Sequence, residues 1–183
     1  SMSNVEHYST DLRRGRRSGD ITIHDRLTRG RLMSQPVERF GVISGMIETA
    51  ENLARDYNIS REQADAFAVR SHQRAAAAWA NGLFDDEIVP VQVPQRKGAP
   101  AVFAHDEGYR GDATIESLGA LKAIEGGVVT AGNASQQNDA AAACLVVAED
   151  KLAELGLEPI AFYHSSAAAG CDPSRMGIGP VPA

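Results

Sequence analysis

Residues 128–146, VVTAGNASQQNDAAAACLV, carry the strongest fold signal in the chain. Two valines and a threonine lead into a run of small residues, and an unbroken apolar stretch follows at 140–148. A short continuous apolar run is typical of a strand that is buried on both faces. We therefore predict a short strand at 128–131 and a buried strand at 140–148.

The residues after this stretch continue an α/β pattern. Residues 149–155 predict a short helix closed by Gly156, and residues 159–166 predict a further apolar strand. A β-α-β order is typical of a layered α/β sheet. Strands buried on both faces need neighbouring strands and covering helices. Few further strands and helices are predicted in this chain. We therefore expect it to be part of something larger.

The clearest helix of the chain begins at Ser60. Ser60 and Gln63 have the spacing of a capping box, and Asn81-Gly82 is a typical helix end. Apolar and small residues recur between them at three- and four-residue steps: Ala64, Phe67, Ala68, Ser71, Ala75, Ala78 and Trp79. We predict a helix over these residues with Phe67 and Trp79 at least partly buried. A shorter helix is predicted at 48–57.

The segment after this helix predicts short strands. Residues 88–93 have β character, but Pro90 restricts them to an edge strand. Residues 101–105 are a second candidate strand, with a turn at 95–98, and residues 117–121 predict a helical turn. Residues 1–40 show no apolar period and predict an irregular segment, which is either an ordered excursion or a flexible arm.

Composition excludes several classes of protein. The 183 residues include 18 basic and 24 acidic side chains, for a net charge of −6, which argues against general nucleic-acid or membrane-surface binding. No apolar run approaches the roughly 20 residues of a membrane helix. Two cysteines form no disulfide framework or CxxC metal knuckle. We expect a cytoplasmic protein without a metal, a membrane or a nucleic-acid partner.

One basic cluster leaves two interpretations open. Arg13, Arg14, Arg16 and Arg17 surround Gly15. They could contact an anion, phosphate or nucleic acid, or they could form a solvated charged loop. We favour the solvated loop, because charge clusters usually mark solvated faces and no aromatic residues are interleaved here.

No self-contained catalytic motif is present. The sequence has no GxSxG elbow, P-loop, GxGxxG or HExxH motif. Cys144 is expected to be an inert residue of the buried strand, whereas Cys171 lies in a loop but has no evident activating group. The small residues at 129–135, with Asn133, Ser135, Asn138 and Asp139 as polar anchors, and those at 176–180 would let a ligand approach closely or would simply make tight turns.

Four motifs together resemble the thiolase family, the acetyl-CoA acetyltransferases and 3-ketoacyl-CoA thiolases. They are residues 46–78, MIETAENLARDYNISREQADAFAVRSHQRAAAA; residues 84–91, FDDEIVPV; residues 128–146; and residues 170–183, GCDPSRMGIGPVPA. The resemblance implies a thiolase-like layered α/β core, present in part, with a mainly helical and irregular loop domain. It places that loop (lid) domain at 1–127, the end of the N-terminal half at 128–157 and the start of the C-terminal half at 158–183. A thiolase subunit is about twice this length.

The resemblance also implies the chemistry. Thiolases transfer acyl groups by Claisen condensation or by thiolysis of 3-ketoacyl-CoA, with a cysteine nucleophile, a histidine and a second cysteine. The motifs of all three are absent here, so we expect no catalytic residue in this chain and no activity from it alone. A coenzyme A thioester is the substrate, and no cofactor is implied.

What the resemblance transfers to this sequence is coenzyme A binding. Arg110 and Ser117 match contacts to the nucleotide end, Ala131 and Ser135 match the pantetheine tunnel, and Met46 and Met176 match the acyl end. A surface salt bridge from Arg110 to Asp106 or Glu107 is the alternative. The implied partners are acyl-CoA or CoA and copies of the subunit, as a homodimer or homotetramer, or the remaining fragments of the same subunit.

Departures from the family pattern concern specificity. Gly45-Met46-Ile47 replaces the usual His-Met-Gly, Gln136 replaces the glycine after Asn-Ala-Ser, and the loop between Leu121 and Gly127 is short. These features favour a degradative or broad-specificity enzyme of fatty acid metabolism. The alternative function is a non-catalytic module that binds CoA or another chain.

Overall fold

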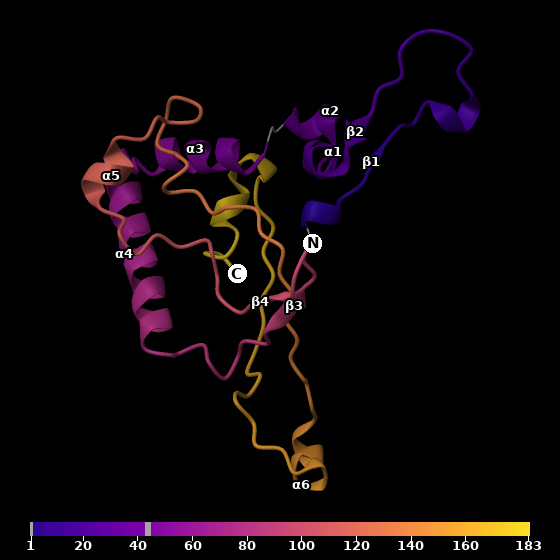
Figure 1. Ribbon diagram of the computed structural model, residues 1–183. Coiled ribbons are helices and arrows are strands. Elements are labelled where there is room, and N and C mark those ends of the chain that lie inside the picture. Colours follow the sequence, from indigo (N-terminus) through magenta and orange to yellow (C-terminus); the bar gives the residue numbers. More distant parts are fainter. Residues whose placement is uncertain (1, 43–44) are drawn as a thin grey trace. The chain divides into compact units, whose positions relative to one another are not determined.

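The chain folds into two compact units. The computed structural model describes residues 2–42 and 45–183, without the side chain of Arg14 (Figure 1). The first unit comprises Ser1–Thr49 and Gln137–Ala183, and the second unit is Ala50–Gln136. Residue 1, where the predicted loop domain begins, lies outside the described residues.

Short elements make up most of both units. Those of the first unit are η1 Met2–Asn4, β1 His7–Tyr8, η2 Leu12–Arg14, β2 His24–Asp25, α1 Arg26–Leu32, α2 Val37–Phe40, η3 Glu149–Lys151, α6 Leu152–Leu155 and η4 Pro173–Ile178. Those of the second unit are α4 Arg61–Ala80, β3 Val91–Val93, β4 Ala101–Phe103 and α5 Ile115–Gly119. Helix α3, Met46–Asp56, begins in the first unit and ends in the second.

The ends of α4 are those that the sequence predicts. Ser60 caps the helix by accepting a hydrogen bond from the backbone N–H of Gln63 at 3.2 Å, and the Gln63 side chain accepts one from the Ser60 N–H at 2.8 Å. Asn81 is the C-cap residue. Between α3 and α4, Asn58 has a φ of 52°, which asparagine tolerates better than most residues. Both predicted helices are therefore confirmed.

The packed face of α4 differs from the predicted apolar stripe. Its buried residues are Asp65, Ala68 and Val69, and the last two form a small core with Ala113 and Leu118. Phe67 is 64% exposed, so its predicted burial is wrong, whereas the partial burial predicted for Trp79 is confirmed. The helix turns a polar residue, Asp65, inward because that side chain has partners in the interior.

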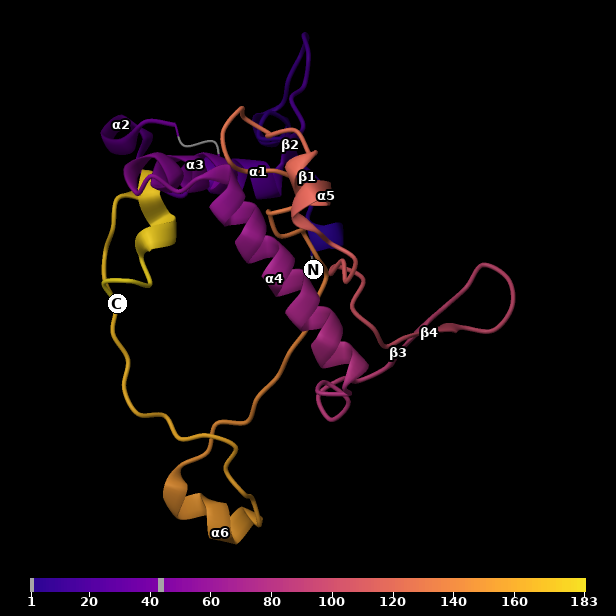
Figure 2. The same cartoon turned by 90° about the vertical axis from the view of Figure 1, so that its left-hand side faces the viewer.

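Strands β3 and β4 form a two-stranded antiparallel hairpin, which is seen from the side in Figure 2. Val91 pairs with Phe103 and Val93 with Ala101. The strand begins after Pro90, whose missing N–H cannot join a ladder, so the sequence prediction is confirmed with shorter ends. Helix α5 follows the hairpin and packs against α4.

The predicted strands of the last third are largely absent from the structure. Residues 128–131 keep only an isolated bridge between Ala123 and Thr130. Residues 140–148 and 159–166 form no strand, and Figure 2 shows them as plain ribbon on either side of α6. Most of these residues are exposed, Cys144 included. A strand needs a hydrogen-bonded neighbour, and no described residues pair with these segments.

The helix between those segments follows the prediction. η3 and α6 together span residues 149–155, and Gly156 closes them in the left-handed conformation, with a φ of 63° and a ψ of 33°. Of the two alternatives for residues 1–40, the described residues favour an ordered excursion, since His7 and Tyr8 pair with Asp25 and His24. Asp25 also caps α1 by accepting from the N–H groups of Leu27 and Thr28.

Within the described residues, we find no helix that has both the length and the apolar character needed to cross a membrane.

We predict that Ser60→Ala lowers the free energy of unfolding by about 1 kcal/mol, because the N–H of Gln63 loses its acceptor. Chemical denaturation of the full chain measures this change. Ser71→Ala, the same substitution at an exposed position inside α4, is the matched control and should not destabilise. Equal unfolding midpoints for Ser60→Ala and the unmodified chain would contradict the cap.

Candidate functional site

A buried carboxylate organises the second unit. The side chain of Asp65 is 3% exposed and accepts a hydrogen bond from Arg61 Nε at 2.7 Å. Its other oxygen accepts from Asn133 Nδ2 at 2.9 Å. A buried charge is costly unless it is paired and hydrogen-bonded. Asp65 satisfies both conditions by joining α4 to the small-residue loop at 130–135.

Asn133 holds that loop in a tight turn. Its Nδ2 donates to the Val128 carbonyl at 2.9 Å as well as to Asp65, and its Oδ1 accepts from the Thr130 N–H at 2.8 Å. The Thr130 hydroxyl in turn accepts from the Gly132 N–H at 3.2 Å. The sequence identified Asn133 as a polar anchor, and the structure shows that it anchors the loop itself.

Glu51 fixes the strand-like residues that precede the loop. Its carboxylate accepts from the N–H groups of Val128 at 3.0 Å and Val129 at 2.8 Å. A Cβ on Gly127 would lie 1.9 Å from a Glu51 oxygen, so a side chain at this position would displace the carboxylate from its N–H partners. Glycine at 127 is therefore part of the same arrangement.

This scaffold leaves Ala131 and Ser135 exposed. Both lie on the loop that Asn133 and Thr130 hold. Gly132 between them packs closely on α5, since a Cβ there would lie 2.9 Å from Leu118 Cγ. The predicted pantetheine contacts are thus two small side chains on a rigid loop.

The Arg110 side chain is exposed, while its backbone is tied to α4. Its N–H donates to His72 Nδ1 at 3.1 Å. Among the described residues, no ion pair joins Arg110 to Asp106 or Glu107. The alternative of a surface salt bridge therefore has no support in the structure.

Ser117 has a structural role in addition to its predicted contact. Its N–H donates to Thr114 Oγ1 at 3.1 Å, and its hydroxyl accepts from the Thr114 N–H at 3.0 Å, which makes a second capping box. The side chain remains exposed at the start of α5. A ligand that used this hydroxyl would share it with the helix cap.

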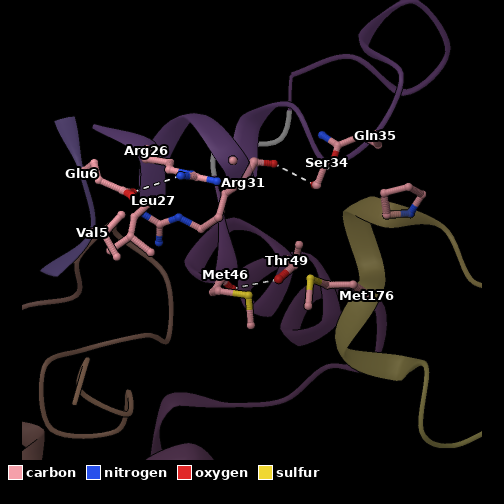
Figure 3. Close-up of a pocket in the computed structure, with 13 residues that line it drawn as sticks. Val5, Glu6, Arg26, Leu27, Arg31, Ser34, Gln35, Met46, Thr49 and Met176 are labelled. Carbon is pink, nitrogen blue, oxygen red and sulfur yellow. Dashed lines mark hydrogen bonds and ion pairs between the residues drawn. The ribbon is translucent and has the colours of Figure 1, made fainter. Parts of the chain in front are cut away.

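Met46 and Met176 line a common cavity of about 720 Å³ in the first unit (Figure 3). Met46 is the first residue of α3 and Met176 belongs to η4. The two thioether side chains come from segments 130 positions apart in the sequence. The fold brings both to one cavity, as their shared assignment to the acyl end suggested. Thr49, whose hydroxyl donates to the Met46 carbonyl at 2.9 Å, lies on the same cavity.

Charged groups lie on this cavity and at the start of η4, which carries Met176. Glu6 pairs with Arg26 at 3.0 Å. The pKa of Glu6 is lowered by a hydrogen bond to its own backbone N–H and, next, by the hydrogen bond from Arg26. Beside Met176, the Ser174 hydroxyl and N–H donate to Asp172 and lower the pKa of that carboxyl. Both carboxylates are thereby held in the ionised form that their partners require.

The two cysteines are the remaining candidates from the sequence. Cys144 and Cys171 are free and exposed, and the expected burial of Cys144 is wrong because residues 140–148 lie outside any core. Cys171 Sγ lies 3.9 Å from the Met176 carbonyl. Across the described residues, no cluster of three histidine, cysteine or acidic side chains could hold a metal.

Several site residues escaped the sequence analysis. Asp65, Glu51 and His72 were not predicted to position the loops, because each acts through a contact 38 to 78 residues away in the chain. One usable signal existed for Asp65. It lies one position from the predicted apolar stripe and four after Arg61, the spacing of a helical ion pair.

The family profile for the thiolase N-terminal domain matches residues 1–150. This chain therefore belongs to the thiolase family. The predicted family and the partial α/β fold class are both confirmed.

Relatives of known name lie within this family. An acetyl-CoA acetyltransferase from Allochromatium vinosum is 46% identical over 185 residues, which cover 100% of this chain and 46% of that protein. A probable acetyl-CoA acyltransferase from Staphylococcus aureus strain COL is 54% identical over 135 residues, 73% of this chain and 34% of that protein.

Solved structures agree with the sequence relatives. The acetyl-CoA acetyltransferase of Bacillus anthracis matches with a TM-score of 0.87 and 40% identity, over 100% of this chain and 45% of that one. Human mitochondrial 3-ketoacyl-CoA thiolase matches with a TM-score of 0.77 and 34% identity, over the same shares. The chain thus spans less than half the length of these relatives.

We predict that Asp65→Ala destabilises the second unit by about 3 kcal/mol, because Arg61 and Asn133 lose their shared acceptor in the interior. The free energy of unfolding from chemical denaturation measures the loss. Arg74→Ala, an exposed charged residue on the same helix, is the control and should change stability by no more than about 0.5 kcal/mol. Similar losses for both variants would contradict the role of Asp65.

Proposed function

We propose that this chain is part of a thiolase subunit that transfers acyl groups between acyl-CoA and CoA. The direction is Claisen condensation or thiolysis of a 3-ketoacyl-CoA. Family membership and the names of the relatives support the reaction class. The reaction uses the coenzyme A thioester as substrate and needs no further cofactor.

The contribution that we assign to this chain is coenzyme A binding. The observation that carries the assignment is the exposed guanidinium of Arg110, which has no carboxylate partner among the described residues although its backbone is fixed on α4. An exposed, planar cation on a fixed backbone suits adenine stacking and phosphate attraction. Ser117, seven residues further on, would add a hydroxyl.

Ala131 and Ser135 would contact the pantetheine arm. Their loop is rigid and offers a small side chain beside a hydroxyl, which leaves space for the arm and an oxygen for its amides. Met46 and Met176 would bound the acyl group, because flexible thioether side chains adapt to varied apolar shapes. Such a pocket favours a broad acyl range and a role in fatty acid metabolism.

A non-catalytic module that binds CoA or another chain is the second candidate. The exposed apolar residues of 140–148 and 159–166 favour a contact with further polypeptide. We propose that this polypeptide is the remainder of the same subunit, which would assemble as a homodimer or homotetramer. The intact mass of the natural protein separates the two candidates, since a thiolase subunit has about twice the mass of this chain.

We predict that the 183-residue chain alone does not cleave acetoacetyl-CoA, because the cysteine and histidine motifs of thiolases are absent from it. Thiolysis is measured with the purified polypeptide, free of complete enzyme. Turnover that disappears in Cys171→Ala would contradict the proposal and identify Cys171 as a nucleophile.

We predict that Arg110→Ala in the complete enzyme raises KM for acyl-CoA several-fold, equivalent to about 1–2 kcal/mol, through loss of a stacked or phosphate-paired cation. With a pantetheine thioester that lacks the nucleotide, KM should change little. Steady-state kinetics with both substrates measure the difference.

Arg96→Ala, which removes an exposed cation from the β3–β4 turn, is the matched control and should leave both KM values unchanged. Equal losses with both substrates for Arg110→Ala would mean a general disturbance of the fold. No loss with either would contradict a contact with the nucleotide.

A further inference from the structure

A single imidazole links the two segments that we assign to coenzyme A. His72 is half-buried on α4. Its Nδ1 accepts the Arg110 N–H at 3.1 Å, and its Nε2 lies 3.4 Å from the Gly132 carbonyl oxygen. Arg110 is 38 residues after His72 and Gly132 is 60 residues after it, so the ring connects distant loops through one helix.

One protonation form of the ring satisfies both contacts. Nδ1 must carry a free lone pair to accept from an N–H, and Nε2 must carry a proton to donate to a carbonyl. The neutral tautomer with its proton on Nε2 meets both requirements, as assigned from the partners. The contact to Arg110 has the length of an ordinary hydrogen bond, whereas the contact to Gly132 is longer and therefore weaker.

The backbone around Arg110 has few other supports. The Ala113 N–H donates to the Arg110 carbonyl at 3.1 Å, which closes a turn over 110–113. Gln73 Nε2 donates to the Ala113 carbonyl at 3.4 Å, so it holds the far end of that turn. His72 holds the near end. The two neighbouring side chains of α4 thus clamp the turn that presents the Arg110 guanidinium.

We propose that His72 is a positioning residue for coenzyme A, which sets the Arg110 turn and the 130–135 loop at a fixed spacing on α4. The inference rests on the proposed function. Without the ring, the turn would have to be ordered when ligand binds, and that entropy would be lost from the binding free energy. The proposed function places the reacting groups outside this chain, so we expect the effect on KM and not on kcat.

Two conservative substitutions separate the two contacts. The side-chain oxygen in His72→Asn and Nδ1 of His72 are separated from Cβ by the same number of bonds. The oxygen can therefore accept from the Arg110 N–H, but the side chain cannot reach the Gly132 carbonyl. In His72→Gln, the amide nitrogen stands in place of Nε2 and can donate to Gly132, while the acceptor for Arg110 is displaced. His72→Leu removes both contacts. Ser71→Ala on the same helix is the matched control.

The experiment uses the complete enzyme with acyl-CoA and with the matching pantetheine thioester. For His72→Leu we expect KM for acyl-CoA to rise about three- to tenfold, with kcat changed less than twofold. For His72→Asn we expect the KM for acyl-CoA to be lower than the KM for the pantetheine thioester, by the same factor as in the unmodified enzyme. For His72→Gln we expect this difference in KM between the two substrates to be lost. Its KM for the pantetheine thioester should equal that of the unmodified enzyme. Ser71→Ala should match the unmodified enzyme throughout.

Three outcomes would overturn the inference. These are unchanged KM values in all variants, identical behaviour of His72→Asn and His72→Gln, and a loss confined to kcat. If His72→Leu does not fold, the comparison of the Asn and Gln variants decides alone. A nucleotide-dependent loss in Arg110→Ala without one in His72→Gln refutes only this inference. No such loss in Arg110→Ala refutes the proposed contact of Arg110 with the nucleotide together with it.

Discussion

The ion pair of Asp65 with Arg61 is the interaction on which the second unit depends. Asp65 is almost fully buried, so its charge requires both Arg61 and the Asn133 amide. Arg61 Nη2 then donates to the carbonyls of Leu118 at 2.6 Å and Leu121 at 3.0 Å. One carboxylate thereby connects α4 with the end of α5 and with the small-residue loop, and ligand contacts are assigned to the last two of these elements.

Local sequence signals were sufficient wherever the cause of structure is local. The Ser60 capping box, the restriction of the strand beside Pro90 to an edge and the helix end at Gly156 each depend on a few neighbouring residues, and all three were predictable. The face of α4 was not, because it is chosen by partners far along the chain. Asp65 turns inward to meet Asn133, and Phe67 is left outside beside Arg70, whose guanidinium lies 4.9 Å from its ring centre.

Strand prediction failed for a different reason. The apolar runs at 140–148 and 159–166 have the composition of sheet interiors, but a sheet forms only when strands supply each other's hydrogen bonds. This chain covers under half the length of its relatives and pairs neither run. Of the site, the sequence placed Met46 and Met176 by resemblance alone. Their common cavity depends on packing between distant segments of the first unit, which no spacing rule expresses.

The exposed apolar residues have a practical consequence for handling the polypeptide. Leu145, Val146, Ile160 and Tyr163 all lie open to solvent, on segments with unpaired backbone groups. Such segments are templates for intermolecular β pairing. Purified by itself, the polypeptide will therefore self-associate as its concentration rises, and light scattering should be checked before any binding curve is interpreted. A solubilising partner would cover these segments, and a lower concentration would reduce the number of encounters between them.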